Sequence, residues 1–479
     1  MSKPSLKKNL LYQSGYEILV LLLPFITSPY ISRVFGAQCL GIYSYTVSIS
    51  YYFQMFAMLG IKFYGNRSIA QCRNDRKLMN KVYSEILLLH IIVSIISLIA
   101  YAVFCCFEKQ YTMYTIIQGM VVLAGLFDVS WFFFGIEQFK ITVVRSTIIK
   151  LISVVLLFVL THNQDDFWIY VVIMAGSQLV NQVVLFIMAR KYVTFEMPEL
   201  KSVFSHLKPM LILFIPVLAL GIYKYTDKIM LGIFGMETEL GYYENAEKIV
   251  NIPLSVVFSF GSVMLPKISQ LTVLGENEAV QRYMRLSIKF MVGLSIGMSA
   301  GLIGIANIFA PVFWGSEFIS SGVLISVLAF SIPFSTFANI VRNQDFIPNG
   351  MDIQYSFSIL LGALVNIVLN YLLIPAYGAL GVSIATVSAE VLVCVVQLLL
   401  SKRKFPYGKY LVGAIGFIIP ASIMLFVVYQ LGCILGLSTL TLVIQVVVGA
   451  IIFCILSIAG MKIIKDRDLN AILHLNLKK

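Results

Sequence analysis

The sequence contains little charge and few of the residue patterns that soluble proteins use for chemistry. Asp, Glu, Lys and Arg make up 12% of the 479 residues, about half of the share that soluble domains carry. Apolar residues make up 59%, more than a soluble core could hide from water. The apolar runs are about 20 residues long, which is the length that a helix needs to cross a bilayer. We therefore predict an all-α polytopic membrane protein.

Cysteine and histidine are also scarce. The seven Cys residues include no C-x-x-C pair and the four His residues are isolated, so neither a disulfide framework nor a zinc site is predicted. The sequence contains no H-E-x-x-H, G-x-x-x-x-G-K-[ST] or G-x-G-x-x-G motif, and no segment has room for a soluble nucleotide-binding domain. We predict no cofactor, no metal and no enzymatic activity.

The apolar segments set the predicted topology. They lie near residues 9–31, 40–61, 83–107, 112–134, 146–161, 168–189, 209–233, 241–266, 286–312, 319–341, 353–374, 380–400, 410–430 and 439–461. With the N-terminus in the cytoplasm, most of the 35 Lys and Arg residues fall in cytoplasmic segments, which places both termini there by the positive-inside rule. The basic residues of 140–150 are counted among them, and Lys62 and Lys289 are expected to snorkel from cytoplasmic span ends. The net charge of +12 then reflects topology and contact with anionic lipid, not nucleic-acid binding.

One hydrophobic hairpin, residues 215–253, contains charges inside two apolar spans. They are Lys224, Asp227, Lys228, Glu244, Glu247 and Lys248. A charge near the membrane centre costs at least about 2.5 kcal/mol, so such groups normally face a wet cavity or a partner. Lys224 and Lys228 are four residues apart and share one helical face. The hairpin is therefore predicted to line a polar passage with a cationic bias; the alternative is that internal ion pairs only lock helices together.

A short motif recurs after the first, seventh and eleventh segments. It reads F-G-A-Q-C-L-G-I-Y at 35–43, F-G-M-E-T-E-L-G-Y-Y at 234–243 and Y-G-A-L-G at 377–381. The first two copies are six segments apart and enter the membrane with the same polarity, which suggests two parallel six-helix bundles. The alternative is that a glycine motif recurs because of turn chemistry alone.

These patterns define the predicted fold. It has about 14 transmembrane helices, arranged as two pseudo-symmetric six-helix bundles and two C-terminal helices. We expect an N-terminal lobe at 1–208, a C-terminal lobe at 209–408, and two further spans with a cytoplasmic tail at 409–479. A duplicated bundle around a cleft is typical of alternating-access transporters.

Four further polar residues lie inside predicted spans. Asp128 and Glu17 are candidate proton or sodium sites, because carboxyl groups within a membrane often have such roles. The alternative for both is a neutral, hydrogen-bonded acid in helix packing. For Glu390 and His90 we favour helix packing.

Three stretches resemble a known family. They read P-F-I-T-S-P-Y-I-S-R-V-F-G-A-Q-C-L-G-I-Y-S-Y-T at 24–46, D-V-S-W-F-F-F-G-I-E-Q-F-K-I-T-V-V-R-S at 128–146, and Y-T-D-K-I-M-L-G-I-F-G with L-G-Y-Y-E-N-A-E-K-I within 225–249. In these stretches the chain is similar to the polysaccharide transporter family, the Wzx-type O-antigen and capsule repeat-unit flippases of the MATE-like MOP superfamily. The resemblance implies a V-shaped, two-lobed transporter of the bacterial inner membrane with a cationic central cavity. It also implies an undecaprenyl-diphosphate-linked oligosaccharide as cargo, and we expect a polymerase and other glycan-export proteins as partners.

The cargo chemistry assigns roles to the hairpin. Lys224 and Lys228 would hold the diphosphate as point charges. Asp227 would orient these lysines or exchange protons with Asp128 or Glu17, with a proton or sodium gradient driving transport. The further candidates are Lys248, Arg33 and Tyr223 for substrate and Glu244 for coupling.

Three other functions compete with this interpretation. A MATE-type multidrug or cation antiporter should prefer a net-acidic cleft, whereas the two spans of this hairpin hold three lysines and three acids. A lipid II flippase shares the cargo chemistry and differs in the sugar. A membrane-embedded glycan polymerase or ligase should show a large external loop, and all external loops here are short.

Overall fold

A computed structural model describes residues 6–401 and 405–463 of the chain. The side chains of 6–14, 16–18 and 21 lie outside the described part. All regular secondary structure in the described residues is helical, and the chain divides into two compact units, Met1–Gly241 and Tyr242–Lys479.

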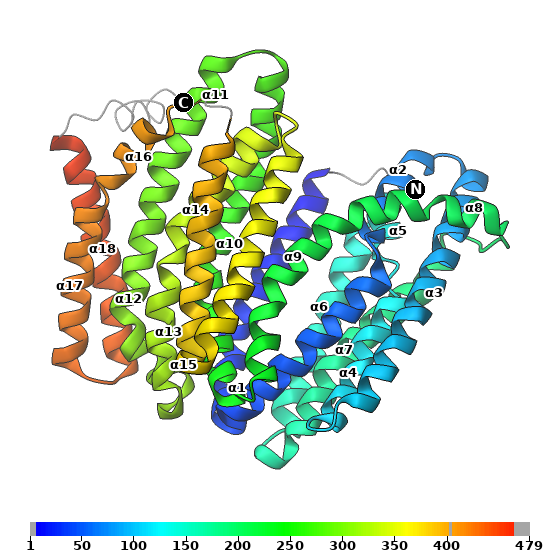
Figure 1. The fold of residues 1–479 in the computed structure, drawn as a ribbon, viewed down its shortest axis with the longest axis horizontal. Helices are drawn as coiled ribbons and strands as arrows, with labels where there is room; N and C mark the ends of the chain where they lie inside the picture. The colour runs from blue at the N-terminus through cyan, green and yellow to red at the C-terminus, as the bar shows by residue number, and fades with distance from the viewer. Residues whose placement is uncertain (1–5, 402–404, 464–479) are drawn as a thin grey trace. The chain divides into compact units, whose positions relative to one another are not determined.

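The first unit is built from nine α-helices in the described residues. They are α1 (Leu6–Met58), α2 (Ile61–Cys72), α3 (Arg76–Phe107), α4 (Thr112–Leu126), α5 (Ser130–Gly135), α6 (Phe139–Leu160), α7 (Phe167–Ala189), α8 (Leu200–Ser205) and α9 (Leu207–Ile233). Helix α4 is central, because it contacts α1, α3 and α7 (Figure 1).

The second unit follows the same principle. Its helices are α10 (Glu237–Val273, which begins in the last residues of the first unit), α11 (Asn277–Ser287), α12 (Gly293–Trp314), α13 (Ile319–Ala329), α14 (Ser331–Val341), α15 (Asp352–Leu400), α16 (Tyr407–Ile415), α17 (Ile418–Leu435) and α18 (Thr439–Ile463). Short π-helical segments, η2 (Ile288–Val292) and η4 (Arg342–Phe346), precede α12 and extend α14. Helix α12 is central here and contacts α13, α14, α17 and α18. The predicted cytoplasmic tail after Ile463 lies outside the described residues.

The prediction of a multi-pass all-α membrane protein is confirmed. From Arg76 to Ile463, eleven helical stretches of the described chain are long and apolar enough to cross a bilayer. Each predicted apolar segment falls within these helices or within α1, although α1 and α15 each contain two segments. The fifth segment was placed too late, at 146–161, because α6 begins at Phe139. The lobe boundaries at 208 and 408 stay predictions.

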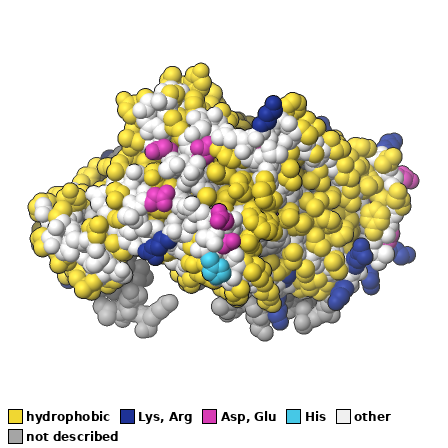
Figure 2. Space-filling view, turned by 90° about the horizontal axis from the view of Figure 1, so that it is seen from below, with side chains coloured by type: hydrophobic (Ala, Val, Ile, Leu, Met, Phe, Trp, Pro, Cys, Tyr) yellow, Lys and Arg dark blue, Asp and Glu magenta, His cyan; other side chains and the backbone are white. Residues whose placement is uncertain are grey.

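The outer surfaces carry the hydrophobic side chains that lipid requires. On α3, Ile96 is 61% exposed and Phe107 is 77% exposed. Figure 2, seen from below the view of Figure 1, shows hydrophobic side chains over much of this face, interspersed with Asp, Glu, Lys, Arg and His side chains. Such exposed apolar area would be a liability in water and is expected of a helix that faces acyl chains.

The recurring glycine motif has a backbone cause. Its first glycine has positive φ in all three copies: 72° at Gly36, 69° at Gly235 and 53° at Gly378. Only glycine adopts this conformation without strain. In α1 and α15 it allows two spans to join through a kink without a loop.

The second glycine of the motif permits a close backbone contact within the first unit. A Cβ atom at Gly41 would overlap the carbonyl oxygen of Glu237, and one at Gly241 would overlap the carbonyl oxygen of Ala37. Each glycine therefore touches the residue four positions before the other, so the first two copies of the motif pack reciprocally. The hydroxyl of Tyr111 also donates to the Glu237 carboxylate and fixes this turn.

The stretch D-V-S-W-F-F-F-G, the most specific part of the family resemblance, forms the core of the first unit. Trp131, Phe132 and Phe133 are fully buried. Tyr83 of α3 stacks on Trp131 with ring centroids 5.5 Å apart. Gly65 of α2 lies against the same indole, where a Cβ atom would come within 2.5 Å. This aromatic cluster fixes α2, α3 and α5 to one another.

We predict that Gly41→Ala destabilises the protein. The added methyl group overlaps the Glu237 carbonyl oxygen, and such overpacking typically costs roughly 1–3 kcal/mol of unfolding free energy. Gly408→Ala on α16 is the control, because nothing lies within 4 Å of its Cβ position and alanine favours a helix. Thermal unfolding of the detergent-purified chain measures both. Equal stability of the two variants would contradict the close contact.

Candidate functional site

A polar pocket of about 320 Å³ lies inside the first unit. Helices α1, α2, α4, α6 and α7 and the turn after α4 contribute its lining. Its main polar side chains are those of Lys62, Asp128, Lys150, Gln54, Gln178 and Asn181. Since the surrounding helices face lipid or each other, this pocket places hydrogen-bonding groups where water or a polar ligand can reach them.

An ion pair lies at this pocket. Lys62 Nζ is 3.3 Å from Asp128 Oδ2, and the two side chains are 58% and 3% exposed. The lysine that was expected to snorkel is therefore the partner of a buried intramembrane carboxylate. The pairing explains how Asp128 tolerates a nearly dry site, because removing one partner would leave an uncompensated buried charge.

Local backbone geometry places both partners of the pair. Leu59 and Gly60 have positive φ and turn the chain sharply between α1 and α2, so Lys62 lies in the first turn of α2. Asp128 follows the last turn of α4, and its Oδ1 accepts a hydrogen bond from the Ser130 backbone N–H at 3.0 Å. This Asx-type turn starts α5, and the buried Trp131 next to it holds the turn in place.

His90 of α3 belongs to the same cluster. Its side chain is buried and lies within electrostatic range of Asp128 and Lys62. This burial is consistent with the packing role that the sequence favours for His90. The nearby charged pair makes its imidazole a further group that can hold a proton.

The predicted diphosphate residues lie on α9. Lys224 is exposed, and its Nζ lies 5.4 Å from the ring centroid of Tyr225. Asp227 and Lys228 are buried and both take part in further interactions. Tyr223 is half-buried.

The remaining predicted residues whose side chains are described are not among those that line the polar pocket. Arg33 is exposed on α1, and the side chain of Glu17 lies outside the described residues. In the second unit Lys248 Nζ lies 3.2 Å from Glu244 Oε1 on α10. This pair spans one turn of a single helix, so it cannot by itself lock two helices together. Among the predicted site residues with described side chains, Asp128 alone lines the pocket.

Glu390 of α15 behaves as the packing interpretation predicts. It accepts a hydrogen bond of 2.7 Å from Ser335 of α14. Lys289 was expected to snorkel, and that expectation is wrong: it lies in η2, is 6% exposed, and its stem lies 3.3 Å from the Cβ position of Gly413. Neither residue lines the polar pocket.

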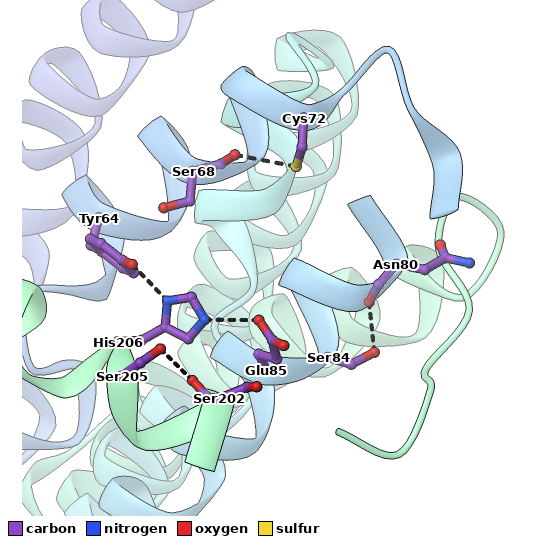
Figure 3. A network of polar contacts seen from close by, with 9 residues as sticks. All are labelled: Tyr64, Ser68, Cys72, Asn80, Ser84, Glu85, Ser202, Ser205 and His206. Atoms are coloured by element: carbon purple, nitrogen blue, oxygen red, sulfur yellow. Dashed lines mark hydrogen bonds and ion pairs between the residues drawn. The ribbon is translucent and has the colours of Figure 1, made fainter. Parts of the chain in front are cut away.

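A second polar network ties α2 and α3 to the segment before α9 (Figure 3). The Tyr64 hydroxyl lies 2.6 Å from His206 Nδ1, and His206 Nε2 lies 3.0 Å from Glu85 Oε2. Nearby, burial raises the pKa of the Cys72 thiol, whose Sγ donates to the Ser68 carbonyl at 3.2 Å. These contacts fix the start of α9, the helix that holds Lys224.

Two polar features were missed in the sequence. Ser146, Lys150 and Ser153 form one face of α6, and Gln178 and Gln182 lie four residues apart on α7. Spacings of three and four residues are the signal that could have found these faces. The predicted span starts at residue 146, which places Lys150 at a cytoplasmic junction. In the structure α6 starts at Phe139, so Lys150 lies in the middle of that helix.

Asp345 of η4 is a missed buried carboxylate in the second unit. It is 1% exposed and accepts hydrogen bonds of 2.8 Å from both Ser401 and Tyr407. Asn349 Nδ2 donates to its other oxygen at 3.0 Å. This full set of donors assigns Asp345 to the local fold, where it ties α15 and α16 to η4.

Comparison with known proteins now decides the family. A model of the family described as polysaccharide biosynthesis protein matches residues 6–272, which is more than half of the chain. The chain belongs to this family. A relative in Shigella dysenteriae named "Putative O-antigen transporter" is 25% identical over 399 residues, which cover 82% of this chain and 99% of the relative. The predicted family membership is confirmed.

Solved structures show that this chain has the predicted class of fold. The lipid II flippase MurJ in an inward closed conformation matches with a TM-score of 0.78, 15% identity, and coverage of 95% of this chain and 99% of that chain. An inward-facing MATE multidrug-resistance transporter of the MOP superfamily matches with a TM-score of 0.54, 13% identity, and coverage of 85% and 99%. At these identities the similarity concerns the fold alone.

We predict an energetic coupling between Lys62 and Asp128. Lys62→Met leaves the Asp128 carboxylate buried without its cation and should lower the unfolding free energy by roughly 1–3 kcal/mol. Asp128→Asn in the same chain should recover part of this loss, because no buried charge remains. Lys77→Met, at an exposed position, is the control. Thermal unfolding of the unaltered chain, the two single variants and the double variant measures the cycle, and strictly additive effects would contradict the coupling.

Proposed function

We propose that the protein is a flippase. It moves undecaprenyl-diphosphate-linked oligosaccharide repeat units from the cytoplasmic to the outer leaflet by alternating access. One observation supports this most: a pocket lined by amides, hydroxyls and two lysines lies among membrane-spanning helices. The relative named as an O-antigen transporter aligns with this chain over 99% of its own length. This alignment supports the proposal for the aligned 82% of the chain and not only for the pocket.

The diphosphate would bind at the lysines of α9. Lys224 is exposed and can contact the phosphate groups directly. Lys228 is buried and would attract them mainly through its electrostatic potential. Asp227, one residue before Lys228, would keep both lysines oriented. A lysine ammonium suits this task because it binds phosphate as a compact point charge. Lys248, Arg33 and Tyr223 are the further candidates for substrate contact.

The second unit offers a site that suits a polyprenyl chain. An apolar cavity of about 430 Å³ lies among α10, α12, α17 and α18. Gly297, Gly301 and Gly449 open its walls, and Phe453 and Met424 complete the lining. Such a cavity offers an isoprenoid chain an apolar site beside the lipid phase and offers little to a polar molecule.

The proposed setting is the bacterial inner membrane, with both termini in the cytoplasm and with polymerase and other glycan-export proteins as partners. We infer no enzymatic step, because moving the cargo between leaflets breaks no bond. A MATE-type drug antiporter fits less well: two lysines and one aspartate line the pocket, so its charge favours an anionic ligand over a cationic drug. The similarity to the lipid II flippase concerns the fold and does not favour lipid II as cargo.

We predict that the α9 lysines are required for glycan export. A strain that lacks its own repeat-unit flippase should regain surface glycan with the unaltered chain and lose most of it with Lys224→Ala/Lys228→Ala. Lys201→Ala/Lys208→Ala removes two exposed lysines, one on α8 and one in the first turn of α9, and should leave export intact. Surface glycan is measured at matched expression and thermal stability. Full glycan from the α9 double variant would reject the diphosphate site, and failure of the unaltered chain would reject the function.

We also predict that transport depends on an ion gradient through Asp128. The Asp128, Lys62 and His90 cluster provides groups that can exchange a proton or bind sodium. In sealed vesicles loaded with lipid-linked glycan, transport should accelerate when a proton or a sodium gradient is imposed. Asp128→Asn should remove this acceleration, whereas Glu244→Gln tests the candidate acid of the second unit. Transport that is indifferent to both gradients would reject the coupling.

A further inference from the structure

We propose that the polar pocket of the first unit binds an acidic sugar of the cargo, with Lys150 holding the carboxylate. The inference rests on the proposed function and adds a sugar class to it. The pocket is separate from the α9 lysines, none of which lines it.

Lys150 is the residue that most needs a ligand. It lies in the middle of α6 (Phe139–Leu160), a span of high hydropathy. A lysine at such a depth is costly unless it faces water or an anion. Among the described residues no carboxylate lies within ion-pair distance of Lys150, whereas Lys62 has Asp128. Lys150 is thus half-buried and lines a cavity, and no carboxylate of the described residues pairs with its ammonium group.

The direction of the Lys150 side chain follows from its helical face. Ser146, Lys150 and Ser153 all line the pocket, and positions separated by four and three residues lie on the same side of a helix. The Ser153 hydroxyl donates its proton to the Lys150 backbone carbonyl at 2.7 Å, so its oxygen faces a ligand as an acceptor. The ammonium and the two hydroxyls therefore form one continuous polar edge.

The opposite wall suits the hydroxyl groups of a sugar ring. Helix α7 contributes Gln178, Asn181 and Gln182, and α1 contributes Gln54. Side-chain amides both donate and accept, as sugar hydroxyls do. Gln182 Oε1 is buried with no hydrogen-bond partner in the described residues, so a bound hydroxyl would satisfy an acceptor that is otherwise left unpaired.

The charge of the pocket distinguishes a sugar carboxylate from the diphosphate. Among the side chains that line the pocket, Lys62 is neutralised by Asp128, so Lys150 leaves one net positive charge. The Arg145 guanidinium adds a second cation next to the lining, because it donates to the Ser146 hydroxyl at 3.2 Å. A sugar carboxylate would bring one negative charge towards Asp128, whereas a diphosphate would bring at least two. The volume of about 320 Å³ also lies within the range of small-molecule sites.

A chain of contacts leads from the predicted phosphate lysine to this pocket within the first unit. Lys224 lies over the Tyr225 ring, and Tyr225 stacks on Tyr51 with centroids 5.4 Å apart. Gln178 Nε2 in turn donates to the Tyr51 hydroxyl at 2.7 Å, at the pocket lining. A sugar attached close to the diphosphate is therefore the part of the cargo that this pocket would hold.

Binding to the purified full chain tests the proposal without transport. The probes are glucuronate, glucose and inorganic pyrophosphate, each titrated at constant ionic strength while thermal unfolding is followed. Glucuronate should raise the unfolding temperature more than glucose at equal concentration. Lys150→Met should weaken apparent glucuronate binding roughly tenfold or more, because a charge-assisted hydrogen bond is lost. Its response to glucose should not change.

Matched variants separate charge from fold. Lys140→Met removes an exposed lysine from the same helix and should bind glucuronate as the unaltered chain does, and Lys150→Arg should retain the preference. Gln182→Leu should weaken both sugars equally. The proposal is overturned if glucuronate and glucose protect alike, if Lys150→Met keeps the preference, or if only pyrophosphate protection depends on Lys150. If the unaltered chain binds glucuronate as expected but does not restore export, the proposed function fails and the sugar site stands. If it restores export but shows no preference for glucuronate, the sugar site alone fails.

Discussion

The cost of placing a charge among membrane-spanning helices governs this structure. A buried ammonium or carboxylate must find a counter-ion, water or a polar ligand, and the first unit uses more than one of these solutions. Asp128 is paired with Lys62 at 3.3 Å, whereas Lys150 lines a polar pocket without a described carboxylate partner. The polar pocket follows from this constraint, because apolar packing alone could not surround these groups.

The apolar parts of the chain hold the charged parts in position. The aromatic cluster around Trp131 is fully buried and follows Asp128 directly in sequence, so the packing that stabilises α5 also fixes the carboxylate. The left-handed turn at Gly60 does the same for Lys62. The proposed coupling site and the packing of the first unit therefore share one short stretch of the chain.

Several features of the site were accessible from local patterns, and others were not. The lysines of α9 were found because a charge within a long apolar run stands out on its own. Lys150 was missed because the start of its span was read seven residues late, which made an intramembrane lysine look cytoplasmic. The polar faces of α6 and α7 have helical spacing, but a stripe of Ser, Gln and Asn can face a cavity or a neighbouring helix, and only the packing distinguishes these cases.

The sequence by itself determined that the chain is a multi-pass helical membrane protein and where most of its spans lie. These properties depend on the hydrophobicity and length of contiguous segments, because each segment enters the bilayer according to its own composition. The sequence also determined the kinks, since a recurring glycine permits the positive φ that they need. Only the tertiary structure decided that Lys62 is the partner of Asp128, that His90 joins them, and that residues from α1, α2, α6 and α7 share one pocket. Those contacts join residues far apart in the chain, and which helix faces meet is settled by side-chain packing across the whole unit.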